Sequence, residues 1–128
     1  MISKLLCVTL AVGGWLVLTG CAPEVVRTPV AFSAAGEDGQ ATVRIRQATS
    51  VTPSTGYTKT IKAGSAWRRV GTLPQGSVYR PVGDVFAVEG ANMHEAYLVV
   101  AEGQLVGFYL VGERAFAPLA DKVPLPME

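Results

Sequence analysis

The sequence contains very little cysteine and histidine. Of its 128 residues, two are cysteines, Cys7 and Cys21, and one is a histidine, His94. Both cysteines lie among the first 21 residues, so the chain from Ala22 onward has no thiol. This excludes a disulfide framework, a cysteine-ligated zinc site and a cysteine nucleophile from that part of the chain. We expect no metal and no other cofactor.

The chain also lacks an excess of charge of either sign. Eleven Lys and Arg stand against ten Asp and Glu, and such a balance gives no general attraction to nucleic acid. The charge is nevertheless uneven, because residues 27–80 carry eight basic and two acidic side chains, whereas residues 81–128 carry two basic and seven acidic ones. This asymmetry indicates either a polar interaction surface or, as we favour, oppositely charged strands that pair across one sheet.

No hydrophobic run has a comfortable length for a permanent membrane span. The uncharged stretch Leu5–Leu18 has 14 residues, whereas a helix needs about 20 to cross a bilayer. It follows the basic residue Lys4 and has the length of the hydrophobic region of a signal peptide.

The stretch ends in Leu18-Thr19-Gly20-Cys21, which resembles the lipobox of bacterial outer-membrane lipoproteins with type II signal peptides. The resemblance covers residues 1–21. It implies that the Cys21 sulfur receives a lipid, that the signal is cut between Gly20 and Cys21, and that acyl chains then anchor the protein to the membrane. Ala22 stands where an aspartate would imply retention in the inner membrane, so the resemblance implies an outer-membrane anchor facing the periplasm.

The rest of the chain is expected to be a tether, residues 21–40, followed by one small domain, residues 41–128. Pro23, Pro29, Gly36 and Gly39 interrupt any periodicity in the first part, although Val25-Val26 and Val30-Ala31-Phe32 could form a short strand. Alternating patterns and frequent turn residues in the second part predict an all-β fold, a small barrel or sandwich of about seven or eight short antiparallel strands. The expected strands are Ala41–Arg46, Tyr57–Lys62, Trp67–Thr72, Ser77–Arg80, Asp84–Val88, Ala96–Val100, Leu105–Val111 and Ala115–Leu119.

Two apolar runs around Ala101-Glu102-Gly103-Gln104 predict a hairpin with Gly103 at positive φ. Gly107, inside the second run, predicts a bulge or a large ring packed across the glycine. Residues 48–56 are expected to form a loop, and Asn92–Tyr97 is the one candidate for a helical turn.

Few residues suggest a functional site. His94 beside Glu95 invites an acid–base interpretation, but adjacent strand residues point to opposite faces, so we expect an exposed turn histidine. No spacing of the acidic residues selects a catalytic pair, and no catalytic residue is predicted. The most distinctive stretch is Trp67-Arg68-Arg69, which with Tyr79 is a possible binding surface for a glycan or a protein. Burial of Trp67 and Tyr79 in a small core is the simpler interpretation.

These features predict a membrane-anchored, non-catalytic accessory or scaffold lipoprotein that binds another envelope protein. The alternative is a peptidoglycan- or glycan-binding module that uses the region of Trp67 and Tyr79. An anchored hydrolase is the least favoured hypothesis, because no nucleophile–base set is present.

Overall fold

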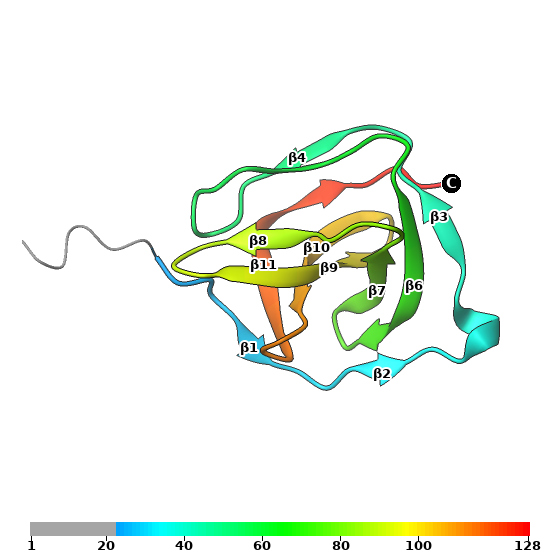
Figure 1. Ribbon diagram of the computed structural model, residues 1–128, viewed down its shortest axis with the longest axis horizontal. Helices are drawn as coiled ribbons and strands as arrows, with labels where there is room; N and C mark the ends of the chain where they lie inside the picture. The colour runs from blue at the N-terminus through cyan, green and yellow to red at the C-terminus, as the bar shows by residue number, and fades with distance from the viewer. Residues whose placement is uncertain (1–22) are drawn as a thin grey trace, which may run out of the picture.

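The computed structural model describes residues 23–128, which form an all-β domain (Figure 1). This confirms the predicted fold class. The expected signal peptide, with Gly20 and Cys21, lies outside the described residues. Within residues 23–128, no helix combines the length and hydropathy that a membrane span requires. The elements are β1 (Thr28–Pro29), β2 (Ser33–Ala34), the 3-10 turn η1 (Glu37–Gly39), β3 (Thr42–Arg44), β4 (Thr49–Val51), β5 (Lys59–Ile61), β6 (Ala66–Leu73), β7 (Gly76–Pro81), β8 (Ala87–Glu89), β9 (Met93–Ala101), β10 (Gln104–Leu110) and β11 (Ala115–Pro124).

Most strands belong to one curled antiparallel sheet that forms a half-barrel. Its strand order is β1-β11-β10-β9-β7-β6-β2, with β3 paired to β6 and β8 paired to β9. The hairpin β4–β5 forms a separate small sheet. Three of the longest strands, β6, β9 and β10, carry the β-branched and aromatic side chains that favour extended backbone.

Alternate residues of the central strands pack into two different cores. On β9, Leu98 belongs to a large core and Val99 to a smaller one, and on β10 the same holds for Phe108 and Tyr109. Successive side chains of a strand point to opposite faces, so the sheet is covered on both sides. This double burial explains why both the odd-numbered and the even-numbered positions of Leu105–Val111 are apolar.

The segment before β3 runs across the sheet as a strap, which we define as residues 28–40. Its first strand, β1, pairs with β11 at one edge of the sheet, and its second, β2, pairs with β6 at the other edge (Figure 1). Between them, the Phe32 ring stacks on Tyr109 with centroids 5.3 Å apart. The prediction of a flexible tether over residues 21–40 is therefore wrong for the strap, because its short strands complete both edges of the sheet and cover the smaller core.

The residues before the strap are also fixed to the domain. The backbone N–H of Ala91 donates to the carbonyl of Pro23 (3.0 Å), and Val25 is buried against the turn between β8 and β9. The chain therefore joins the folded body from Pro23 onward, close to the tip of the β8–β9 hairpin (Figure 1).

The β9–β10 hairpin confirms the prediction of a turn at Glu102-Gly103. Gly103 has φ +75° and Glu102 has φ +53°, so the turn requires positive φ at both central residues, as in type I′ turns. The register shifts between Leu105 and Gly107, and a Cβ on Gly107 would lie 2.8 Å from the Phe116 ring. Both expectations for Gly107, a bulge and a ring across it, are thus confirmed.

Two local predictions are wrong. Asn92–Tyr97 is not a helical turn, because residues 93–101 form β9, which pairs with β8 through the register Val88 to His94. The expected loop over residues 48–56 contains the strand β4, which the pairing with β5 stabilises. Strands of two or three residues are stabilised by their partners rather than by a local pattern, which is why the sequence indicated too few of them.

Candidate functional site

The single histidine is buried at the start of β9 rather than exposed in a turn. His94 retains 5% of its accessible surface, and its Nδ1 lies 2.8 Å from Oε2 of Glu113, in the turn between β10 and β11. Since a carboxylate accepts, Nδ1–H is the donor in this bond. The neighbouring Glu95 points to the opposite face of β9 and is exposed, as the strand alternation predicted. The prediction of an exposed turn histidine is therefore wrong. Residue 94 belongs to a strand that pairs with β8, and its side chain lies on the buried face of that strand.

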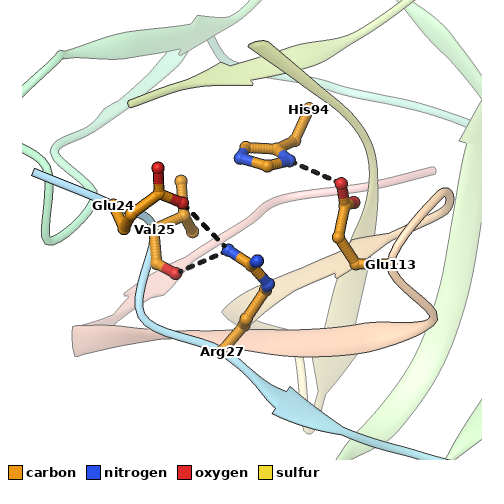
Figure 2. Close-up of polar contacts among 5 residues, drawn as sticks. All are labelled: Glu24, Val25, Arg27, His94 and Glu113. Carbon is orange, nitrogen blue, oxygen red and sulfur yellow. Dashed lines mark hydrogen bonds and ion pairs between the residues drawn. The ribbon is translucent and has the colours of Figure 1, made fainter. Parts of the chain in front are cut away.

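The other imidazole nitrogen, Nε2, is buried and has no hydrogen-bond partner among residues 23–128. In Figure 2 this nitrogen points away from Glu113, on the side where Glu24 and Val25 lie. Nδ1 carries the proton that reaches Glu113, and Nε2 faces no acceptor among the described residues.

Arg27 lies next to this pair and is held by the N-terminal segment. Its guanidinium forms an ion pair with Glu24 (3.4 Å) and donates to the carbonyl of Val25 (3.3 Å) (Figure 2). Burial acts to raise the pKa of the Glu113 carboxyl, but the hydrogen bond from His94, a backbone hydrogen bond and the charges of His94 and Arg27 outweigh it, and the pKa lies below its ordinary value. Glu113 is therefore a carboxylate at neutral pH.

The N-terminal segment that carries Arg27 thus lies beside the His94–Glu113 pair, and the geometry of this pair suits a structural role. An acid–base role would need a reacting group near Nε2, and that nitrogen faces the packed interior. Among the described residues, no group of three or more His, Cys, Asp or Glu side chains is placed to hold a metal ion.

The residues of the predicted binding surface are not one surface. Trp67 is 3% exposed, packs edge-on against Phe86 and donates its indole N–H to Ser65 Oγ (2.9 Å). Tyr79 is half-buried against the same core, and Arg69 is held by the carbonyl of Gly39 and by Ser77. For Trp67 and Tyr79 the simpler interpretation, burial in a small core, agrees with the structure.

Arg68 is different, because it points to the opposite face of β6 from Trp67. It also has a cross-strand neighbour that the sequence spacing did not suggest. Arg80 lies directly across from it on β7. Among residues 23–128, neither arginine has a carboxylate within ion-pairing distance. Both line a shallow pocket of about 330 Å³ with Tyr97 and the carboxylates of Asp84 and Glu95.

Like charges directly opposed on neighbouring strands destabilise a sheet. The repulsion between Arg68 and Arg80 therefore lowers the stability of the folded sheet, so the pair is not explained by folding. Two guanidinium groups side by side offer a forked set of N–H donors for a carboxylate or another planar anion. The two strands together create this pair, so no local motif in the sequence predicted it.

Comparisons with known proteins add no relative, since no family model, no curated protein and no solved structure matches the chain.

Proposed function

We propose that this protein is a lipid-anchored, non-enzymatic accessory module of the bacterial outer membrane, which faces the periplasm and binds another envelope protein. The proposed location rests on Leu18-Thr19-Gly20-Cys21, which has the position and sequence context of a lipobox. The covalent lipid on Cys21 is the only attachment to the membrane that the proposal requires.

The observation that supports partner binding is the Arg68–Arg80 pair. Both side chains lie on the face of the sheet turned away from the large core, next to the half-buried Tyr97. Arginine and tyrosine are the residue types that concentrate binding energy in protein interfaces. The partner segment that fits is acidic, because a carboxylate relieves the repulsion between the two guanidinium groups.

The alternative, a peptidoglycan-binding module, depended on an accessible aromatic platform. Trp67 is buried under Phe86 and Ser65, so that platform is absent from the surface in the described part of the chain. Peptidoglycan binding is retained as an outcome of the test below.

The anchor is tested first by mass spectrometry of the mature protein from membranes. We expect an N-terminus at acylated Cys21, and we expect Cys21→Ser to leave uncleaved precursor. Soluble, correctly cut Cys21→Ser protein would show an ordinary secretory signal and overturn the anchor.

Partner binding is tested by a photo-crosslinking residue at Val82, which is exposed and lines the same pocket. The matched control places that residue at the exposed Asp121 of β11. We expect one protein adduct from position 82, none from 121, and loss of the adduct in the Arg68→Gln, Arg80→Gln double variant. An adduct that survives the double variant, or binding to isolated sacculi without any adduct, would overturn the proposal.

A further inference from the structure

The N-terminal end of the described domain is fixed next to the predicted lipid attachment. Pro23 is held through its carbonyl by the N–H of Ala91, and Val25 is 3% exposed. Pro23 is only two residues after Cys21, and two residues span at most about 7 Å. A headgroup layer is itself about 5–8 Å thick on each side of the hydrocarbon core. A lipid on Cys21 therefore leaves no length of chain to lift the domain off the membrane.

The same end of the domain contains two loops joined to each other. The Thr55 hydroxyl, in the loop between β4 and β5, bonds to the carbonyl of Glu89 at the end of β8. A Cβ on Gly90, in the next turn, would lie 2.9 Å from Val25 and 3.1 Å from Thr55. Figure 1 shows the two hairpin tips and the incoming chain at one end of the molecule. We name this end the anchor face, and it consists of residues 23–27, 52–58 and 89–93.

Large apolar side chains project from the anchor face into solvent. Val26 is 61% exposed, Met93 is 63% exposed and Tyr57 is 44% exposed. They account for three of the five large exposed apolar residues in the described chain. The adjacent charges of Glu24 and Arg27 neutralise each other in an ion pair. The exposed Glu89 leaves the face with a single net negative charge. An apolar, weakly charged rim with a tyrosine is typical of a surface that meets the headgroup region of a bilayer.

We infer that the anchor face lies directly on the lipid headgroups, so that the bilayer is a second contact of the domain besides the covalent lipid. This inference rests on the proposed lipidation of Cys21. It gives the domain a fixed orientation. The far end of the sheet, where Leu105 pairs with Val123 and the β9–β10 turn lies, points away from the membrane.

The test uses the full-length lipoprotein in vesicles of phosphatidylethanolamine and phosphatidylglycerol that carry a headgroup nitroxide. A lipidated Cys21 has no free thiol, so a fluorophore is attached to a single new cysteine, at Met93→Cys in the anchor face or at Asp121→Cys near the far end. We expect the nitroxide to quench the fluorophore at position 93 several-fold more than the fluorophore at position 121. A third variant inserts a flexible Gly-Ser segment between Ala22 and Pro23 of the Met93→Cys chain, and we expect its quenching to fall toward that of position 121.

Each outcome is decisive. Equal, weak quenching at both positions in protein whose Cys21 carries lipid would overturn the inference and leave the proposed function intact. Strong quenching at position 93 that the insertion does not change supports the apolar contact itself as the main attachment of this face. Thiol labelling of the mature chain, from which the signal with Cys7 has been removed, would show a free Cys21, and would overturn the proposed anchor together with this inference.

Discussion

His94 Nδ1 lies 2.8 Å from Glu113 Oε2, and this contact joins the start of β9 to the turn after β10. Glu113 is in turn near Arg27, which belongs to the N-terminal segment that leads to the strap. Three stretches far apart in the sequence therefore lie close together around the His94–Glu113 pair (Figure 2).

The pKa of Glu113 is lower in the folded protein than its ordinary value, because His94 and Arg27 favour the carboxylate. A lowered folded-state pKa stabilises the protein fully above the unfolded-state value, about 4.3. This stabilisation is lost as the pH falls through the lower, folded-state pKa. We expect Glu113→Gln to lower the free energy of unfolding at pH 7 by on the order of 1 kcal/mol. The difference from wild type should shrink below about pH 4. Urea melts at both pH values measure this, and a constant difference would contradict it.

The strap depends on the absence of a side chain at Gly71. A Cβ there would lie 2.3 Å from the Ser33 carbonyl oxygen and 2.5 Å from the Phe32 ring. We expect Gly71→Ala to separate β2 from β6 and to speed exchange of the Ala35 amide, which donates to Val70 across this contact. Hydrogen exchange followed by NMR measures the effect.

Gly36, in the same strap, is the matched control for Gly71. A Cβ at Gly36 would meet no atom within 4 Å, and its φ of −68° suits any residue. Gly36→Ala should therefore leave the Ala35 amide as protected as in wild type. Equal exchange in the two variants would mean that close packing at Gly71 does not hold the strap.

Substitutions at the two central residues of the β9–β10 turn should change the stability of the protein in opposite directions. Gly103→Val places a β-branched residue at φ +75°, which costs about 1–3 kcal/mol of stability. Glu102→Asn should instead stabilise the turn by about 0.5 kcal/mol, because Asn tolerates positive φ and Asn-Gly is the favoured type I′ pair. Glu102→Gln is the neutral control, since both side chains are exposed and neither favours this backbone. Denaturant midpoints measure all three, and a destabilising Glu102→Asn would contradict the turn assignment.

Neighbouring residues on β6 should differ sharply in their effect on folding. Trp67→Ala empties part of the large core and should cost about 3–5 kcal/mol. The Arg68→Gln, Arg80→Gln double variant removes two surface charges that oppose each other and should change the free energy of unfolding by no more than about 0.5 kcal/mol. Chemical denaturation measures both. A loss of several kcal/mol in the double variant would mean that the arginines serve the fold and are not free for a partner.

The sequence determined the local features of this protein. Alternation and turn residues predicted the all-β class, and two apolar runs around Glu102-Gly103 predicted the hairpin, because these signals act between residues that are neighbours in the chain. Gly107 could be recognised for the same reason, since a glycine inside an apolar strand indicates a bulge or a close approach. The lipobox is read from the sequence alone, and it remains a prediction.

Only the tertiary structure decided which distant residues meet. Residues 28–40 have the composition of a linker, yet they pair with both edges of a sheet whose strands come much later in the chain. His94 became buried through the partnership of β8 and β9, and Arg80 came to oppose Arg68 through the register of β6 and β7. Burial and cross-strand pairing depend on the register and curl of the whole sheet, which no single segment encodes. For that reason the pattern predicted the strands but not the strap, the buried histidine or the pair of arginines.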